Sequence, residues 1–416
     1  MRNIFNDDVM TLDTYIMFKL KEQTTKLTPE LKAKGRTPIS LSMGAPTANP
    51  PKALIDRLKE LLDEDGIHMY STPKGEPYYR QAIAERMKKR FGVDMDPETE
   101  IFSLVGSKEG IANLIRFLIN PKKDELEKDI IMVPDPCYAS YLQFIKCSGG
   151  KAYSMPMTEE NNYKPNVEEI YHQILKDGYK AENIKAMIIN FPNNPLGVMT
   201  TREYVKSCID FCKKHEILLI SDAAYCDMYF GDEVEKPFSV FEIAGAKDIA
   251  VEFFSFSKPY AVTGWRLGWV CGNKDIIQRL GKGKSTIDNG IFKALQKACA
   301  EILNSPEGEK YIEEGNKGYA RKQAIMVKGF KELGWPISEK TVPHTTFYLW
   351  LPIPERYSSS FEFCEDVLKT SGVVLVPGNA FGEHGEGYFR LSFVCSDEQL
   401  QEVIDRFKAD GFTFNK

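Results

Sequence analysis

The sequence predicts an α/β protein, with a mostly parallel seven-stranded sheet in a large domain and a smaller domain of the α+β type. Between about residues 97 and 275, short apolar runs bounded by Gly, Pro, Asn or Asp alternate with longer helix-like stretches. This pattern is typical of βαβ units and a parallel sheet. After residue 290 the pattern changes to long charged helices and two more strand-like runs. Because a single hydrophobic core stops growing at roughly 250–300 residues, the 416 residues of this chain indicate two domains.

Seven apolar runs are the expected strands of the large sheet. They lie at residues 100–106, 129–135, 151–157, 185–191, 217–225, 251–257 and 266–273. Most of them end in small or polar residues. Open α/β sheets bind ligands beyond the carboxyl ends of their strands, so we expect the chemistry where these runs stop.

The expected domains follow from the same change of pattern. We predict an N-terminal arm that shares in the small domain (residues 1–49), a large cofactor-binding domain (50–290) and a small C-terminal domain (291–416). The arm holds an amphipathic stretch and the turn-rich SMGAPTANPP. In the small domain a long charged helix at 309–334 precedes the strand-like runs TFYLWLP and YFRLSFV.

Composition excludes several classes of protein. There are 54 Lys and Arg against 59 Asp and Glu, a formal net charge of −5, with no basic block, whereas a nucleic-acid binder needs a concentrated basic face. No stretch approaches ~18 uninterrupted apolar residues, and the N-terminus lacks the pattern of a signal peptide. The nine cysteines are scattered singly, as free thiols are in a reducing cytosol. We expect a cytoplasmic protein that binds neither nucleic acid nor membrane.

The tightest group of metal-ligand residue types is Cys208, Cys212 and His215, whose spacing places them on one face of a helix. Val205 and Ile209 lie among them. Buried thiols on an amphipathic helix are therefore favoured over a metal site, and no metal is expected.

Lys258 follows a strand-like run rich in phenylalanine, so its ammonium should emerge beside apolar walls. Desolvation lowers the pKa of a lysine and makes the amine nucleophilic. Ser255, Ser257 and Arg266 are close in sequence, and hydroxyls with a guanidinium suit a phosphate monoester. A nucleophilic lysine beside a phosphate site is what pyridoxal phosphate requires.

Two other strand ends supply groups that this cofactor needs. Asp222 ends an apolar run and could pair with a pyridinium nitrogen, while Tyr225 and an amide of Asn193 or Asn194 could donate to the ring oxygen. Each residue alone has an ordinary explanation as a helix cap or a turn. Their order and their common position at strand ends favour a cofactor site.

A further phosphate contact is expected where a strand passes through Gly106, Ser107 and Lys108 into a helix, because amides at a helix N-terminus bind phosphate. Tyr138, after another strand, is placed to stack on the cofactor ring.

The strings SFSKPYAVTGWRLGWVCGN, INFPNNPLG and ISDAAY resemble the lysine, asparagine and aspartate–tyrosine motifs of the class I and II aminotransferases of fold type I, from about residue 15 to the end. The resemblance implies a three-layer α/β/α large domain, pyridoxal 5'-phosphate as cofactor and a homodimer with shared active sites. Lys258 would form the Schiff base, Asp222 would pair with the pyridine nitrogen, and Asn194 and Tyr225 would hold the ring oxygen. The phosphate would be bound by Ser107, Lys108, Ser255, Ser257 and Arg266, with Tyr70 reaching it from the neighbouring subunit.

The run VPGNAFGEHGEGYFRLSF resembles the family's stretch that ends in the arginine for the substrate α-carboxylate, here Arg390, and Gly44 resembles the glycine of its mobile lid. A bidentate guanidinium would fix the carboxylate and leave the α-hydrogen exposed. By that resemblance the chain moves an amino group from an amino acid to a 2-oxo acid in a ping-pong reaction.

Substrate choice depends on positions that resemble those of LL-diaminopimelate aminotransferases: Tyr15, Lys108, Tyr138 and Asn289. Lys108 also resembles a lysine of bacterial aspartate aminotransferases. Both imply an acidic or carboxylate-tipped substrate such as aspartate, glutamate or LL-diaminopimelate. Alternatives are an alanine or aromatic aminotransferase, or a carbon–sulfur lyase, decarboxylase or acyl-transferring synthase on the same fold.

Two glycine-rich runs do not support nucleotide binding. GKGKST at 281–286 has Gln278 where a phosphate loop needs its first glycine. GEHGEG at 382–387 has the wrong glycine order for a dinucleotide fold and precedes its strand.

Overall fold

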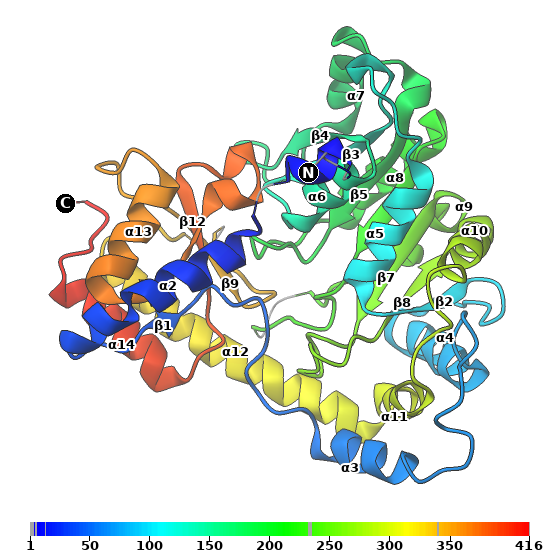
Figure 1. Cartoon of the computed structure of the whole chain (residues 1–416), viewed down its shortest axis with the longest axis horizontal. Coiled ribbons are helices and arrows are strands. Elements are labelled where there is room, and N and C mark those ends of the chain that lie inside the picture. The colour runs from blue at the N-terminus through cyan, green and yellow to red at the C-terminus, as the bar shows by residue number, and fades with distance from the viewer. Residues whose placement is uncertain (1–3, 5, 13, 232–234, 339–340, 416) are drawn as a thin grey trace.

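The computed structural model describes residues 4, 6–12, 14–231, 235–338 and 341–415. The chain forms two lobes that are joined by the long helix α12 (Pro306–Glu332) (Figure 1). The larger lobe holds a seven-stranded sheet and the smaller lobe a three-stranded one. The expected α/β protein with a second, smaller lobe is thus the observed architecture.

The large sheet has the strand order β2-β8-β7-β6-β5-β3-β4. Its strands are β2 (Ile101–Leu104), β3 (Ile130–Asp135), β4 (Lys151–Pro156), β5 (Ile184–Asn190), β6 (Leu218–Asp222), β7 (Ala250–Ser255) and β8 (Gly268–Gly272). Strands β4, β3, β5, β6 and β7 pair in parallel, and β8 is antiparallel to both β7 and β2. Each predicted run overlaps one of these strands, with β5 and β7 beginning one residue before the predicted start, so the mostly parallel sheet is confirmed.

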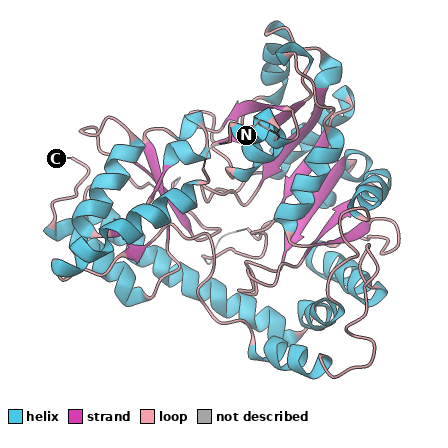
Figure 2. Cartoon of the chain, in the orientation of Figure 1, coloured by secondary structure: helices cyan, strands magenta, loops and turns pink. Residues whose placement is uncertain are grey.

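Helices cover both faces of this sheet, as Figure 2 shows. One face packs against α5 (Ser107–Leu118), α6 (Ser140–Cys147) and α10 (Lys274–Lys284). The cluster on the other face includes α3 (Lys52–Leu61), α4 (Pro77–Phe91), α7 (Val167–Lys176), α8 (Arg202–His215) and α11 (Lys293–Leu303), and α9 (Ala246–Ile249) lies beside α8. Along β6, Leu218 and Ile220 belong to the first cluster and Leu219 to the second. Both sides of the strands are buried except in the edge strand β4, which is mostly half-buried. This burial explains the continuous apolar runs of the other strands.

The helix after the predicted boundary at residue 290 lies with the larger lobe. Helix α11 packs against α3 and α4, and its residues Ala298, Cys299 and Ile302 join the larger hydrophobic cluster. The exact domain boundaries stay predictions.

The smaller lobe is built on the antiparallel sheet of β11 (Val376–Pro377), β12 (Tyr388–Ser392) and β9 (Tyr348–Pro352). A short parallel pair joins β1 (Ile39–Ser40) to β10 (Val373–Val374). Helices α13 (Ser360–Ser371) and α14 (Asp397–Ala409) complete the lobe. Phe330, Phe363, Phe389 and Phe407 pack together at its centre.

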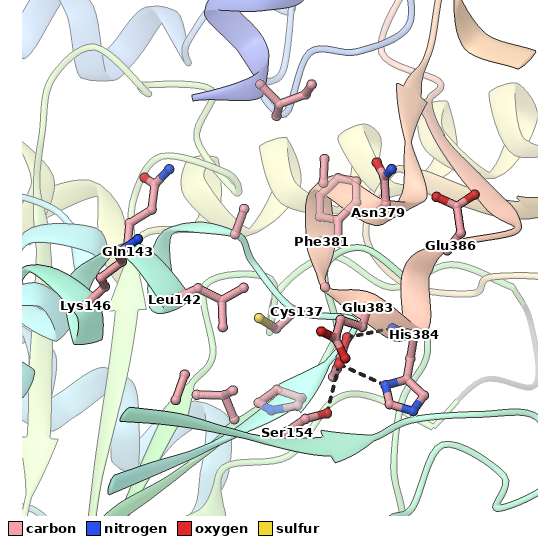
Figure 3. A pocket seen from close by; sticks show the side chains of 18 of the residues that line it. Cys137, Leu142, Gln143, Lys146, Ser154, Asn379, Phe381, Glu383, His384 and Glu386 are labelled. Atoms are coloured by element: carbon pink, nitrogen blue, oxygen red, sulfur yellow. Dashed lines mark hydrogen bonds and ion pairs between the residues drawn. The ribbon is translucent and has the colours of Figure 1, made fainter. Parts of the chain in front are cut away.

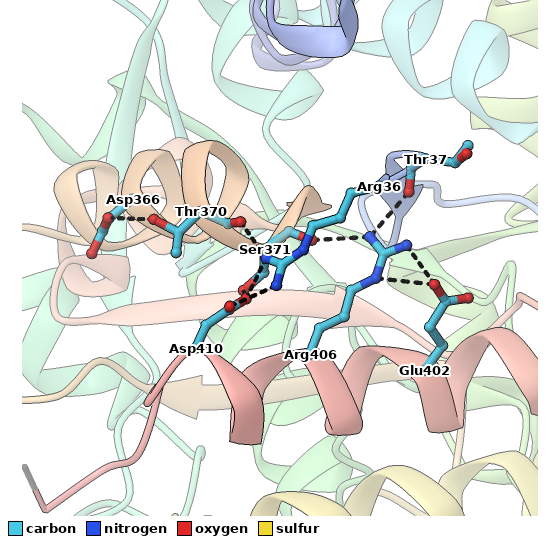
Figure 4. A network of polar contacts seen from close by, with 8 residues as sticks. All are labelled: Arg36, Thr37, Asp366, Thr370, Ser371, Glu402, Arg406 and Asp410. Carbon is cyan, nitrogen blue, oxygen red and sulfur yellow. Dashed lines mark hydrogen bonds and ion pairs between the residues drawn. The ribbon is translucent and has the colours of Figure 1, made fainter. Parts of the chain in front are cut away.

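The N-terminal residues attach to both lobes. Helix α2 (Ile16–Ala33) packs against the smaller lobe through Leu20 and Leu31, and the short α1 (Asp7–Met10) lies beside α6. After α2, Arg36 donates to both carboxylate oxygens of Asp410, at 2.6 and 2.7 Å (Figure 4). This bidentate pair fastens the end of α2 to the end of α14.

Two sequence patterns that were not assigned to chemistry have structural roles. Cys208 and Cys212 are fully buried on α8, as expected for core thiols. In GKGKST, a Cβ at Gly283 would stand 2.4 Å from the ring of Phe117, so the glycine lets α10 approach α5 closely. Among the helices described, none is long and apolar enough to cross a membrane.

Candidate active site

A cavity of about 420 Å³ lies at the carboxyl ends of β5, β6 and β7, between the two lobes. Most of the predicted site residues line it: Tyr15, Gly44, Ser107, Lys108, Tyr138, Asn194, Asp222, Tyr225, Ser255, Ser257, Lys258, Arg266 and Arg390. The prediction that chemistry gathers where the strands stop therefore matches the position of this cavity.

Lys258 follows β7 and extends into the cavity. Its Nζ donates to the carbonyl oxygen of Gly44 and lies 5.7 Å from the centre of the Tyr225 ring. The pKa of Lys258 is lowered to about 8, mainly by burial and then by the positive charges of Arg390 and Arg266, while Asp222 acts in the opposite direction. The neutral amine, which can act as a nucleophile or base, is therefore much more populated near neutral pH than in an ordinary lysine.

Asp222 is buried at the end of β6. Its Oδ2 accepts a hydrogen bond of 2.5 Å from Tyr141 Oη, and its Oδ1 accepts from the amide of Ala224 at 3.2 Å. Burial raises the pKa of Asp222, while these hydrogen bonds act in the opposite direction. No Lys or Arg of the described chain forms an ion pair with it, so the carboxylate is placed to meet a cation from a ligand.

An anion-binding cradle is formed where α5 begins beside the loop after β7. The N-terminal turn of α5 presents Ser107, and Arg266 Nη1 donates to Ser257 Oγ at 3.4 Å. Arg266 has a φ of +55°, a conformation that L residues seldom adopt outside constrained sites. A Cβ at Gly106 would stand 2.3 Å from Arg266 Nη2, so this glycine allows the guanidinium to reach the helix N-terminus. Hydroxyls, helix amides and a guanidinium together suit a phosphate.

Tyr225 and Asn194 both line the cavity, and each contacts a residue of the smaller lobe. Tyr225 Oη lies 2.8 Å from Tyr348 Oη. Asn194 Oδ1 accepts from Arg390 Nη1 at 2.8 Å, and the backbone N–H of Asn194 donates to Asn190 Oδ1 at 3.0 Å. Both side chains are thus held in place by contacts that leave their faces toward the cavity.

Arg390 on β12 is only 4% exposed and has no acidic partner among the described residues. Its Nη2 donates to the carbonyl oxygen of Ser42 at 3.0 Å, and its guanidinium lies over the rings of Tyr348 and Phe381, at 4.3 and 4.7 Å. Its Nε is buried without a hydrogen-bond partner. A buried guanidinium with an unused donor is suited to a carboxylate ligand.

Lys108 lies at the exposed edge of the cavity. Its Nζ is 5.4 Å from the centre of the Tyr15 ring and 5.8 Å from that of Tyr138. None of the described acidic side chains forms an ion pair with it. Burial raises the pKa of Tyr15, so this phenol stays neutral beside the lysine.

Tyr70 and Asn289 do not line the cavity of their own chain. Tyr70 is 83% exposed, and Asn289 is also exposed. Their loops lie close together, because Gln296 Nε2 donates both to Ser71 Oγ and to the carbonyl oxygen of Ile291. Their expected role in a neighbouring subunit stays a prediction.

Several cavity residues were missed from the sequence: Tyr141, Asn190, Thr263 and Tyr348. Tyr141 follows Tyr138 by three residues, which places it nearby on the first turn of α6. A search for polar residues three or four positions after the predicted strand-end residues, where a helix begins, would have found it. Tyr348 stands within a predicted strand of the other domain, and nothing local indicates its contact with Tyr225.

The comparisons with known proteins agree with this geometry. The family model described as aminotransferase class I and II matches residues 36–407. An LL-diaminopimelate aminotransferase of Aquifex aeolicus is 37% identical over 404 residues, which are 97% of this chain and 98% of the relative. The apo structure of BacF from Bacillus subtilis has a TM-score of 0.90 and 32% identity, with both chains covered completely. Aspartate aminotransferase of Thermus thermophilus with maleate shares the fold, with a TM-score of 0.86 at 24% identity over 99% of this chain and all of that one.

Proposed function

The chain belongs to the class I and II aminotransferases, and within that family we propose that it uses pyridoxal 5'-phosphate to transfer the amino group of a carboxylate-tipped amino acid. Amino acids and 2-oxo acids are the substrates of this family. The choice of cofactor and of side chain rests on the groups that line the cavity.

The donor set fits pyridoxal 5'-phosphate. Ser107, Ser255, Ser257 and Arg266 would hold the phosphate, and Asp222 would face the ring nitrogen. Tyr225 and Asn194 would contact the ring oxygen, with Tyr138 against the ring and Lys258 within reach of the aldehyde carbon. When bound, the cofactor supplies an electron sink for the carbon that bears the amino group.

The chain's own residues would then handle one proton and two carboxylates. With its pKa lowered to about 8, the Lys258 amine can accept the α-proton of the substrate. It would return this proton at the carbon attached to the cofactor ring. Arg390 would hold the α-carboxylate through its unused Nε and terminal nitrogens. Fixing the carboxylate in this way orients the α-hydrogen toward the lysine.

The observation that carries the substrate proposal is Lys108. It is a cation at the edge of the cavity, between the rings of Tyr15 and Tyr138, and no acidic side chain that the structure describes forms an ion pair with it. Arg390, which comes from the other lobe, is also a cation without an acidic partner in the described part of the chain. Two cations on two walls suit a substrate with two carboxylates. The similarity to LL-diaminopimelate aminotransferases supports the same choice.

The surface around Tyr70 supports a homodimer. Met69 and Tyr70 are 70% and 83% exposed, and Ile287 and Phe292, beside the Asn289 loop, are 47% and 40% exposed. Such exposed apolar side chains are typical of an interface. A second copy of the chain would cover these side chains, and Tyr70 and Asn289 of each copy would then lie at the cavity of the other. Light scattering of the purified protein should give twice the 47.3 kDa mass of the chain.

All nine cysteines are free thiols in the structure, which supports the proposed cytoplasmic location.

A spectral titration tests the function. The visible band of the purified holoenzyme is recorded while aspartate, glutamate, LL-diaminopimelate, alanine and tyrosine are added one at a time. We expect bleaching by a carboxylate-tipped donor at much lower concentration than by alanine. If alanine or tyrosine bleaches the band best, the substrate proposal is wrong. If no donor does so, the lyase and decarboxylase alternatives on the same fold gain support.

Lys108→Ala sharpens this test. Loss of the cation should raise the KM for the carboxylate-tipped donor about tenfold, as expected for one charged contact of ~1.5 kcal/mol, and leave the KM for alanine unchanged. Lys122→Ala, at an exposed lysine away from the cavity, serves as the control. An equal effect on both donors would assign Lys108 to the phosphate instead.

A further inference from the structure

A second cavity, of about 1270 Å³, lies beside the first and shares Tyr15 with it. Its walls come from the N-terminal segment, from the ends of β3 and β4 in the larger lobe and from the segment 379–386 in the smaller lobe (Figure 3). This opening separates the lobes next to the substrate site. The contacts that cross it therefore influence how the two walls of that site face each other.

One buried carboxylate joins the lobes across this opening. Asp135, at the end of β3, accepts from the backbone amide of His384 at 3.3 Å and lies 2.9 Å from His384 Nδ1. From within the larger lobe, Ser154 Oγ donates to the same carboxylate at 2.8 Å. Figure 3 labels Ser154 and His384, and its dashed lines mark their contacts. Since an ionised carboxylate only accepts hydrogen bonds, Nδ1 of His384 must carry a proton.

The backbone around His384 is shaped to allow this contact. Gly382 has a φ of +133°, and a Cβ there would stand 2.0 Å from Asp135 Oδ1. Glycine is thus required for the segment to approach the carboxylate. The first glycine of GEHGEG, a run that does not fit a nucleotide site, is explained by this approach.

Each partner of the contact lies three residues from a side chain at the substrate site: Asp135 from Tyr138, and His384 from Phe381, which packs against Arg390. Two residues after Asp135, the amide of Cys137 donates to the carbonyl oxygen of Phe381 at 2.8 Å, and Tyr138 follows in the cavity wall. Three residues before His384, the ring of Phe381 lies against the guanidinium of Arg390, at 4.7 Å. The Asp135–His384 contact therefore connects the wall that carries Tyr138 to the wall that carries Arg390.

We propose that Asp135 and His384 form an interdomain latch, a positioning pair that holds the smaller lobe so that Arg390 faces Tyr138 and Lys108 across the substrate site. Neither residue lines the 420 Å³ cavity. The pair acts by raising the fraction of molecules in which the two walls are correctly placed, and the apparent affinity for a substrate rises with that fraction. This role rests on the proposed function, because it is expressed as affinity for a dicarboxylate.

The test compares three variants of the holoenzyme. His384→Ala should raise the KM for the amino donor and the Kd of succinate, a dicarboxylate without an amino group, about three- to tenfold, while kcat stays within twofold. His384→Asn should restore most of the affinity, since the Asn amide can donate from the position of Nδ1. Gly382→Ala, which pushes on the same carboxylate, should raise the same two constants. His172→Ala, at an exposed histidine on α7, is the matched control.

Hydrogen exchange supplies a readout that does not depend on turnover. In His384→Ala the amide of Cys137 should exchange faster, because its bond to Phe381 opens more often, whereas amides in the centre of β6 should be unchanged. The latch is refuted if His384→Ala leaves the Kd of succinate and the exchange of Cys137 as they are in the parent protein. Faster exchange with an unchanged Kd also refutes it, because the contact would then be structural only. A parent protein that binds succinate but transfers no amino group would overturn the proposed function and leave the latch testable by binding.

Discussion

The two walls of the active-site cavity differ in how their polar groups are held. In the larger lobe, Ser255, Ser257 and Arg266 contact one another within a short stretch of chain after one buried strand. In the smaller lobe, Arg390 is held by Asn194 and by the carbonyl oxygen of Ser42, residues that are 196 and 348 positions away in sequence. The first wall is set by local structure and the second by the placement of one lobe on the other. The difference suggests that cofactor binding and substrate binding can be perturbed separately.

The largest expected effect belongs to the wall of the larger lobe. Lys258→Ala removes the base and should lower kcat about 10⁴-fold, at the upper end of general acid–base effects. The phosphate cradle is untouched, so cofactor binding should persist. Fluorescence titration of the variant with pyridoxal 5'-phosphate measures this binding. Lys274→Ala, at an exposed lysine just after β8, is the strand-end control. Normal turnover in Lys258→Ala would contradict the assignment of the base.

On the other wall, Arg390→Ala should raise the KM for every amino donor. The loss of a buried, hydrogen-bonded charge pair costs about 3 kcal/mol, which corresponds to roughly a hundredfold. Arg390→Lys keeps the charge but loses the planar fork, so an intermediate KM is expected. The absorbance of the bound cofactor should be the same in both variants. An unchanged KM would place the carboxylate site elsewhere.

The sequence predicted the wall of the larger lobe better than the wall of the smaller lobe, because local structure sets the first and the placement of the lobes sets the second. Most of the seven strands could be recognised because they are buried on both faces and end in small or polar residues, although the edge strand β4 is only half-buried. Asp222 and Lys258 stand at such strand ends. Tyr348 could not be predicted, since its contact with Tyr225 forms only when β9 of the smaller lobe meets the larger one. Tyr141 was missed because its role depends on the docking of α6 against the end of β6. The helix α11 shows the same limit, because packing rather than local pattern assigns it to the larger lobe.

Tyr141 provides a smaller test of the wall of the larger lobe. Tyr141→Phe removes the 2.5 Å hydrogen bond to Asp222 Oδ2, and a hydrogen bond to a charged group is worth about 1.5–3 kcal/mol. The pKa of Asp222, which this bond lowers, should rise. A more basic carboxylate competes better for the proton, so the ring nitrogen of the cofactor is protonated less of the time. We expect kcat to fall at least about tenfold, with the acid limb of the pH profile displaced upward.

The matched control for that variant is Tyr153→Phe. Tyr153 Oη donates to Asp177 at 2.6 Å in an exposed tyrosine–aspartate pair, and its loss should leave kcat unchanged. Equal behaviour of the two variants would mean that Tyr141 contributes only packing.

The smallest expected effect tests whether the two walls communicate through charge. In the cofactor-free protein, burial lowers the pKa of Lys258 to about 8, and among the nearby charges Arg390 lowers it most. The rate at which Lys258 reacts with added pyridoxal 5'-phosphate, followed by the visible band, should therefore reach half its maximum near pH 8. Removing a positive neighbour favours the protonated lysine, so Arg390→Met should move this midpoint to higher pH, by less than about one unit because burial remains. A midpoint that does not move would show that the smaller lobe lies too far from Lys258 in solution to act on it, and that the two walls meet only when substrate is bound.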